Sequence, residues 1–323
     1  MSDLACCRLC PRECGADRLS GERGFCGGGS AAELFRWGPH RGEEPPVSGT
    51  RGSGTVFFSR CTLRCLYCQN HPWSQGGAGR PVKAGELANV LRQLRDAGCH
   101  NWNLVSPTPW LPIIREALAE TRRDGNPGIP VVYNTSGFER EKTLESYGDV
   151  ADVFLTDLRY AAEETALEAS GNARYAGVAR SALLAMRRLK GDLRLDADGT
   201  ARSGVICRLL VLPGHAGEAV ANLRWLASQA PATAVSVMAQ YTPAHRAVAE
   251  PPWNRRVSRD EYETVLAAVE ELGFENGWTQ EWGAAPPSEL VGFNMPAGFD
   301  GRQQDLTEWE IRRIPEGARH ERS

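Results

Sequence analysis

Three cysteines between residues 61 and 68 stand close enough in the sequence to bind one metal cluster. Cys61, Cys65 and Cys68 form a C-x3-C-x2-C pattern directly after the apolar run 55–58. Cysteine thiolates are the protein ligands of iron–sulfur clusters, and three of them so near each other can cover one face of a cubane cluster. The stretch offers no fourth cysteine, so a [4Fe-4S] cluster held here would keep one iron open to a small molecule.

A second group of cysteines lies near the N-terminus. Cys7, Cys10, Cys14 and Cys26 are spaced as C-x2-C-x3-C-x11-C, and Cys6 is a competing first ligand. Four soft ligands at this spacing can close a tetrahedral zinc site or hold a second iron–sulfur cluster. We favour a structural metal that holds together a segment too small and glycine-rich to build its own core. An electron-relaying cluster and unmetallated, redox-labile thiols are the alternatives.

The composition is that of an ordinary soluble globular protein, with 41% hydrophobic and 24% charged residues. A net charge of −3 gives no global basic field, so we expect neither nucleic acid nor a membrane as partner. No signal-peptide pattern opens the chain, and no run of 18 apolar residues could span a bilayer. We therefore expect a cytoplasmic protein. In a reducing compartment its ten cysteines indicate metal binding or catalysis rather than disulfides.

Short apolar strands alternate with amphipathic helices from residue 55 onward and must position these cysteines. Strands are expected at 55–59, 102–106, 130–134, 152–156, 205–212 and 234–239. Helices are expected at 85–98, 111–122, 139–146, 162–169, 174–190, 218–228 and 258–272, the last with Ser258 as N-cap. Such alternation predicts a parallel sheet with right-handed crossovers. Six units are fewer than the eight of a closed barrel. A doubly wound sheet also fits, but we predict an α/β fold built as a partial (βα)6 TIM-like barrel.

The chain divides by composition into three parts. Residues 1–50 form a Cys-rich metal-binding segment, 51–283 the partial barrel, and 284–323 a polar C-terminal extension. In the extension we expect a partly disordered tail with at most a short helix around 306–313.

Polar residues follow the predicted strands, at the carboxyl ends where both architectures bind ligands. The stretch 106–108 is rigid and bears hydroxyl groups, and 134–137 offers small hydrogen-bonding groups that could also cap a helix. Asp157 and Arg159 lie on one side of an extended chain and could form an ion pair.

Arg208 interrupts the apolar run 205–212. A buried arginine needs a partner, and one that points into a site can clamp a carboxylate with two hydrogen bonds. We therefore favour a functional role for this residue.

Five blocks resemble radical S-adenosylmethionine (SAM) enzymes of the pyruvate formate-lyase activating enzyme-like type. They are residues 54–59 leading into the cysteines, 103–109, 132–139, 208–215 and 238–243. The N-terminal motif 7–15 resembles a branch of such activating enzymes with a Cys-rich N-terminus. The resemblance extends from about residue 5 to 283.

The resemblance implies a reaction for the open iron. It would chelate the amino and carboxylate groups of SAM, and reductive cleavage would give methionine and a 5′-deoxyadenosyl radical that abstracts hydrogen. Ser106, Pro107 and Thr108 fall where the family's Gly-Gly-Glu segment binds the amino group. They lack its carboxylate, so binding would depend more on hydroxyl and carbonyl oxygens.

Further SAM contacts follow from the same resemblance. Asn134, Ser136 and Asp157 would contact the ribose or the methionine, and Arg159 stands where activating enzymes have a SAM-contacting lysine. Arg208 would face SAM or its carboxylate. Tyr67, between two cluster ligands, either stacks on the adenine or simply packs.

We thus expect a radical SAM oxidoreductase that abstracts hydrogen, with flavodoxin or ferredoxin as electron donor. Activation of a glycyl-radical enzyme is the first candidate for its role. The alternatives are radical SAM modification of a small metabolite or peptide, and a non-catalytic iron–sulfur or zinc protein. Beyond the cluster ligands, the sequence indicates no separate catalytic residue.

Overall fold

A computed structural model describes residues 2–123, 128–283 and 311–313. Its centre is a mixed sheet of eleven strands in which, over these ranges, seven neighbouring strands run parallel. In spatial order the parallel strands are β2 (Ser53–Phe58), β4 (Trp102–Val105), β5 (Val131–Thr135), β6 (Val153–Asp157), β8 (Ala201–Leu210), β9 (Ala234–Met238) and β10 (Gly277–Gln280). The α/β prediction with parallel strands is confirmed, and β10 is a seventh strand that the sequence did not predict.

The sheet does not close into a barrel over the described ranges. Strand β1 (Ala32–His40) pairs antiparallel with β2, and β3 (Arg80–Val82) with β1, at one edge. At the other edge β11 (Ile311–Arg313) pairs antiparallel with β10. The short β7 (Arg194–Leu195) pairs with β8 off the main path. The sheet is therefore open, as a partial barrel requires.

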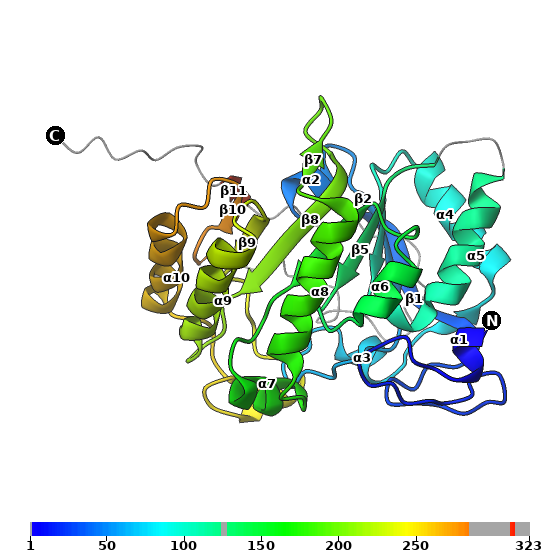
Figure 1. The fold of residues 1–323 in the computed structure, drawn as a ribbon, viewed down its shortest axis with the longest axis horizontal. Helices are drawn as coiled ribbons and strands as arrows, with labels where there is room; N and C mark the ends of the chain where they lie inside the picture. Colours follow the sequence, from blue (N-terminus) through cyan, green and yellow to red (C-terminus); the bar gives the residue numbers. More distant parts are fainter. Residues whose placement is uncertain (1, 124–127, 284–310, 314–323) are drawn as a thin grey trace.

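Strands and helices bury the apolar faces that the sequence pattern indicated. All residues of β2 and β9 are buried, as expected for parallel strands covered by helices. Helix α4 (Ala84–Asp96) buries Leu87, Val90, Leu91 and Leu94. The remaining longer helices are α5 (Leu111–Arg122), α6 (Glu141–Ser146), α7 (Glu163–Ser170), α8 (Tyr175–Lys190), α9 (Ala216–Gln229) and α10 (Arg259–Glu271), and Figure 1 shows α6, α8 and α9 in front of the strands.

Local signals set several of the boundaries. Helix α10 begins at the predicted cap, because the Ser258 hydroxyl accepts a hydrogen bond from the Glu261 amide at 3.2 Å. Helix α7 ends at Gly171, whose φ of 67° is left-handed. Short helical turns complete the fold: α1 (Ser2–Ala5), α2 (Pro45–Ser48), α3 (His71–Ser74), η1 (Thr108–Trp110) and η2 (His245–Ala249).

Two expectations need correction. The predicted strands begin at residue 55, but residues 32–40, inside the Cys-rich segment, form β1 and are hydrogen-bonded to β2 from Leu34 to His40. At the C-terminus, Ile311–Arg313 is a strand and not part of a helix, because it pairs with the edge of β10. The rest of the predicted helix 306–313, and the remainder of the predicted tail, lie outside the described residues.

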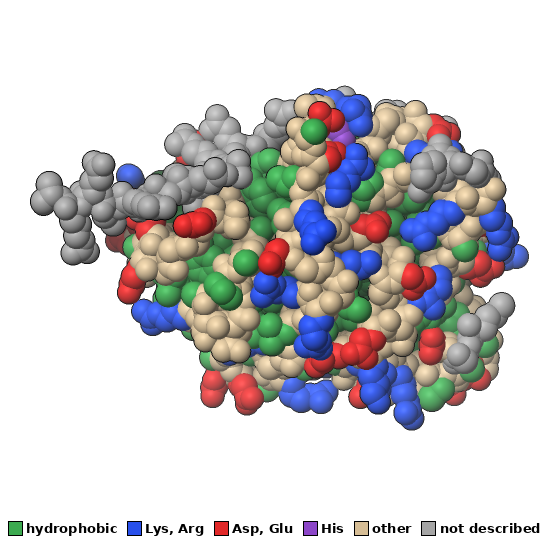
Figure 2. Space-filling view, turned by 45° about the horizontal axis from the view of Figure 1, so that its top comes forward, with side chains coloured by type: hydrophobic (Ala, Val, Ile, Leu, Met, Phe, Trp, Pro, Cys, Tyr) green, Lys and Arg blue, Asp and Glu red, His purple; other side chains and the backbone are tan. Residues whose placement is uncertain are grey.

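The surface carries both signs of charge. Figure 2 shows Lys and Arg side chains interspersed with Asp and Glu over the face in view. None of the helices in the described ranges combines the length and apolar character needed to cross a membrane.

Candidate active site

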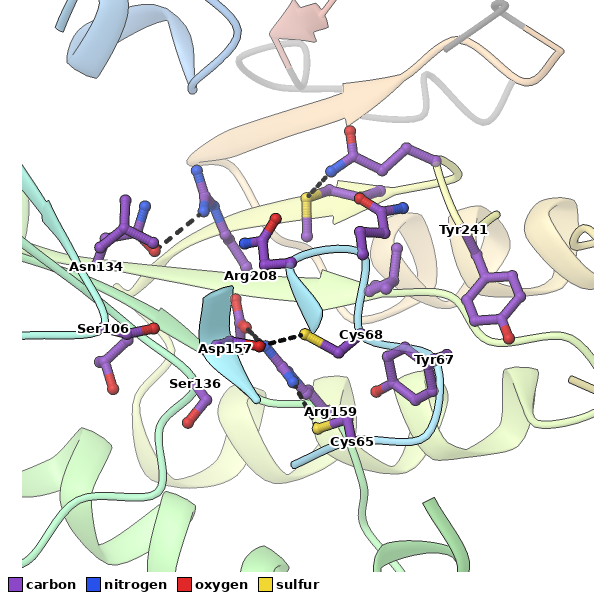
Figure 3. A pocket seen from close by; sticks show the side chains of 18 of the residues that line it. Cys65, Tyr67, Cys68, Ser106, Asn134, Ser136, Asp157, Arg159, Arg208 and Tyr241 are labelled. Atoms are coloured by element: carbon purple, nitrogen blue, oxygen red, sulfur yellow. Dashed lines mark hydrogen bonds and ion pairs between the residues drawn. The ribbon is translucent and has the colours of Figure 1, made fainter. Parts of the chain in front are cut away.

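A cavity of about 260 Å³ lies at the carboxyl ends of the parallel strands. It gathers residues from the cysteine loop after β2 and from the ends of β4, β5, β6, β8 and β9 (Figure 3). The predicted site residues that line it are Cys61, Cys65, Tyr67, Cys68, Ser106, Asn134, Ser136, Asp157, Arg159 and Arg208. The topology thus brings together residues that lie up to 147 positions apart (208 minus 61) in the sequence.

All three cysteines of this loop line the cavity. The Leu63 amide donates to Cys61 Sγ at 3.5 Å, and the Ser74 hydroxyl lies 3.2 Å from Cys68 Sγ. Arg60 and Arg64, just before Cys61 and Cys65, have φ values of 76° and 70°. Non-glycine residues in this left-handed region carry backbone strain, which is concentrated at functional sites. The loop is therefore held in a shape that local preferences alone would not produce.

Burial disfavours free thiolates in this loop. It raises the pKa of Cys61, and it raises the pKa of Cys68 to about 12, with the neighbouring thiols adding to both shifts. The Arg159 guanidinium donates to Cys65 Sγ at 3.1 Å. A metal centre would supply the positive charge that deprotonated thiols need here.

The donor set of three thiols fits an iron–sulfur cluster, whose protein ligands are Cys thiolates. Among the residues that the structure describes, no three His, Cys, Asp or Glu side chains converge as ligands of one ion. In a cubane each thiolate binds a different iron, so three thiols around one cavity need not converge.

Asp157 and Arg159 form the ion pair that their spacing predicted, at the end of β6. Arg159 Nε and Nη2 donate to Asp157 Oδ2 at 2.9 and 2.5 Å. Burial alone would lower the pKa of Arg159, but Asp157 and Cys65 outweigh it and raise the pKa. Arg159 therefore stays charged and joins the cysteine loop to β6, as Figure 3 shows.

The predicted segment 106–108 divides between the cavity and the core. Ser106 lines the cavity with a left-handed φ of 58°. Pro107 and Thr108 are buried outside the cavity lining. The Thr108 hydroxyl donates to Glu139 Oε1 at 2.6 Å, so its hydrogen bond serves the core. Pro107 and Thr108 therefore do not line the cavity in which we expect the cofactor.

The sequence missed two carboxylates that hold Arg208. Arg208 Nε and Nη2 donate to the two oxygens of Glu44 at 2.7 and 2.6 Å, and Nη2 also bonds Glu43. Both glutamates are buried and line the cavity. The predicted bidentate clamp on a carboxylate exists, but its carboxylate belongs to this chain. The only feature of the sequence that could have indicated these partners of Arg208 is the pair of adjacent acids before Pro45.

Asn134 lies in strand β5 just before its last residue, Thr135, and Ser136 directly follows the strand. Asn134 Oδ1 accepts from Arg208 Nη1 at 3.4 Å, and its amide donates to Glu43 at 3.4 Å. The Ser136 carbonyl accepts from the Tyr175 hydroxyl at 2.7 Å, which leaves its side chain at the cavity. Both residues can offer polar atoms to a ligand.

Tyr67 is largely engaged in packing. Its ring stacks on Trp253 with centroids 5.5 Å apart, and its hydroxyl lies 2.6 Å from that of Tyr160. An aromatic cluster thus supports the cysteine loop, and only part of Tyr67 reaches the cavity. Further lining residues that the predicted set did not include are, among others, His40, Ser236, Met238, Gln240, Tyr241, Thr242 and Gln280.

Comparison with known proteins supports a radical SAM assignment for part of the chain. Residues 55–191 match the Radical SAM superfamily. This span contains the cysteine motif and strands β4, β5 and β6. The predicted resemblance is confirmed at the level of the superfamily for these residues, and the activating-enzyme-like branch stays a prediction.

Individual relatives are distant. The uncharacterized protein MJ0674 of Methanocaldococcus jannaschii is 28% identical over 279 residues, which cover 83% of this chain and 75% of that protein. Streptococcus suis SuiB bound to S-adenosylmethionine is 13% identical with a TM-score of 0.46, over 69% of this chain and 48% of SuiB. SuiB bound to precursor peptide SuiA is 13% identical with a TM-score of 0.43, over 69% of this chain and 47% of SuiB. The chain thus spans about half the length of SuiB.

Proposed function

We propose that this chain is a radical SAM enzyme. The observation that carries the proposal is the placement of Cys61, Cys65 and Cys68 around one cavity at the strand ends, within a span that matches the Radical SAM superfamily. The three thiolates would hold a [4Fe-4S] cluster, and SAM would occupy the cavity. When bound, this cofactor pair supplies reductive cleavage of SAM to methionine and a 5′-deoxyadenosyl radical, which abstracts hydrogen.

The residues around the cavity have distinct roles in this proposal. Arg159 holds Cys65 and neutralises part of its negative charge. Asp157 binds Arg159 through Oδ2, which leaves Oδ1 to accept a hydrogen bond from SAM. Ser106, Asn134 and Ser136 provide hydroxyl and amide groups for its ribose and methionine.

Arg208 has a narrower role than the sequence suggested. Its Nε and Nη2 are engaged by Glu44, so a second bidentate clamp on the SAM carboxylate is not available. We propose that Arg208 faces SAM as part of a wall formed with Glu43 and Glu44. Glu43 and Glu44 are buried in this wall, so with SAM bound that side of the cavity would hold little water.

The cluster assignment is tested by metal content. Replacing Cys61, Cys65 and Cys68 together by alanine should remove about four iron and four sulfide ions per chain after anaerobic reconstitution. SAM binding, measured by calorimetry, should weaken in parallel. Cys99→Ala is the matched control, because Cys99 is buried outside the cavity lining. Unchanged iron and sulfide in the triple variant would contradict the proposal.

Within this class we propose glycyl-radical enzyme activation as the reaction to test first. The support is the resemblance of blocks 103–109, 132–139 and 208–215 to activating enzymes. The electron donor would be a flavodoxin or ferredoxin, in the cytoplasm. Anaerobic incubation with a glycyl-radical enzyme from the same genome should give the electron paramagnetic resonance (EPR) signal of a glycyl radical. SAM cleavage without that signal would refute this substrate and favour a small metabolite or peptide.

A further inference from the structure

The N-terminal cysteines lie together although none of them lines the cavity. A tight loop closes the first three, since the Cys7 amide bonds the Ala16 carbonyl at 3.0 Å and the Gly15 amide bonds the Cys7 carbonyl at 2.9 Å. Cys14 Sγ points back to the same Cys7 carbonyl at 3.8 Å. The loop therefore places Cys14 beside Cys7.

Cys26 joins this group from a second loop. A Cβ atom on Gly24 would lie only 2.3 Å from Cys14 Sγ, so the second loop packs directly on the first and requires glycine there. Arg18 crosses between the loops, with Nη1 3.9 Å from Cys7 Sγ and Nη2 2.5 Å from the Gly29 carbonyl. The pKa values of Cys10 and Cys26 are raised, first by burial and also by neighbouring thiols of this same group.

Arg12 connects this group to the cysteine loop of the cavity. It follows Cys10 by two residues, and its Nε donates to the Thr62 carbonyl, next to Cys61, at 3.2 Å. Its guanidinium lies 3.7 Å from the centre of the Phe25 ring. Its Nη2 is buried and has no hydrogen-bond partner. A buried cationic N–H without an acceptor is costly, so this atom indicates a missing anionic group.

We propose that a second iron–sulfur cluster is bound by Cys7, Cys10, Cys14 and Cys26. Arg12 separates it from the cysteine loop of the cavity. A cluster held by four thiolates is anionic and can accept the hydrogen bond that Arg12 Nη2 lacks. Zinc could be held by the same four thiols, and the metal content measured in the test separates the two. Cys14 is exposed, so this cluster is open to a one-electron donor of low potential. The inference rests on the proposed function only for the identity of the neighbouring cluster.

The test starts from the chain in which Cys61, Cys65 and Cys68 are alanine. After anaerobic reconstitution this variant should keep about four iron and four sulfide ions per chain and give a cluster EPR signal with dithionite. Adding Cys10→Ser should abolish the iron and sulfide content and the EPR signal. Adding Cys6→Ser is the control and should change neither, since Cys6 is exposed and competes as a ligand by sequence alone. Zinc in place of iron, or no metal at all, would overturn the proposal.

Two further measurements keep the outcome decisive. Should the combined variants fail to fold, Cys26→Ser in the otherwise unchanged chain should lower iron from about eight to about four per chain. Arg12→Gln should lower the reduction potentials of both clusters, because a cation favours the more negative reduced state, and exposed Arg8→Gln should not. Equal reduction potentials in the Arg12→Gln and Arg8→Gln variants would show that Arg12 does not contact either cluster. Failure of the proposed function looks different: the triple alanine variant would then keep all the iron of the wild type.

Discussion

Substitution of Arg208 tests which interactions hold the cavity wall together. Its guanidinium bonds Glu43 and Glu44, and all three side chains are at most 13% exposed. Arg208→Gln would leave two carboxylates buried without a cation. Breaking a buried ion pair from one side costs about 3–5 kcal/mol, because the remaining charge is uncompensated. Set against a typical total stability of about 5–15 kcal/mol, the loss should be large and directly measurable.

The pH dependence of this loss identifies its cause. Burial would raise the pKa of Glu43, but Arg208 outweighs burial and lowers it. Without Arg208 the pKa should rise above its usual value, so the folded variant takes up protons as the pH falls. Its stability should therefore recover toward acid pH, where the carboxylates are neutral.

Urea unfolding of the wild type, Arg208→Gln, Glu44→Gln and the double variant, at pH 8 and pH 5.5, measures the effect. We expect a loss of about 3–5 kcal/mol at pH 8, a smaller loss at pH 5.5, and partial rescue in the double variant. A loss below about 1 kcal/mol, or the same loss at both pH values, would refute the reasoning. SAM affinity of the double variant, measured with the cluster intact, tests whether Arg208 also faces SAM: unaltered affinity would leave it a structural role alone.

Two other predictions concern groups around the site. Burial raises the pKa of Glu139 to about 7 from a usual 4.5, so wild-type stability should fall by roughly 3 kcal/mol as the pH rises from 4.5 through 7. Glu139→Gln should remove this dependence in urea unfolding, and an unchanged pH profile would show that the carboxyl is not buried as described. Arg159→Gln should lower the reduction potential of the cluster at Cys65 in an EPR-monitored titration, since it removes a cation 3.1 Å from Cys65 Sγ; a potential equal to that of the wild type would contradict a direct electrostatic role.

The sequence was sufficient where the signal is local. Six strands were predicted because parallel, fully covered strands such as β9 read as short apolar runs. The cysteine motif needed no tertiary information, and the spacing of Asp157 and Arg159 predicted their ion pair. Strand-end reasoning also identified several of the residues that line the cavity, among them Asn134, Asp157 and Arg208.

Other parts of the fold and of the site could not be predicted, mainly because they depend on long-range contacts. Glu44 contacts Arg208 across 164 residues, and no pattern near either one indicates the other. Strand β10 is short and ends in Thr279 and Gln280, so it lacks the apolar run of its neighbours. Thr108 looked available as a free hydroxyl, but the buried Glu139 takes its hydrogen bond. For Glu44 and Thr108 a partner distant in the sequence decided the outcome, whereas the polar residues of β10 concealed that strand.

The most direct test of the central claim is formation of 5′-deoxyadenosine from SAM. The reconstituted chain, incubated anaerobically with SAM and dithionite, should release 5′-deoxyadenosine and methionine. The variant without Cys61, Cys65 and Cys68 should release none, and Cys99→Ala should behave as the wild type. A chain with its full iron and sulfide content that forms no more 5′-deoxyadenosine than the triple variant would contradict the account.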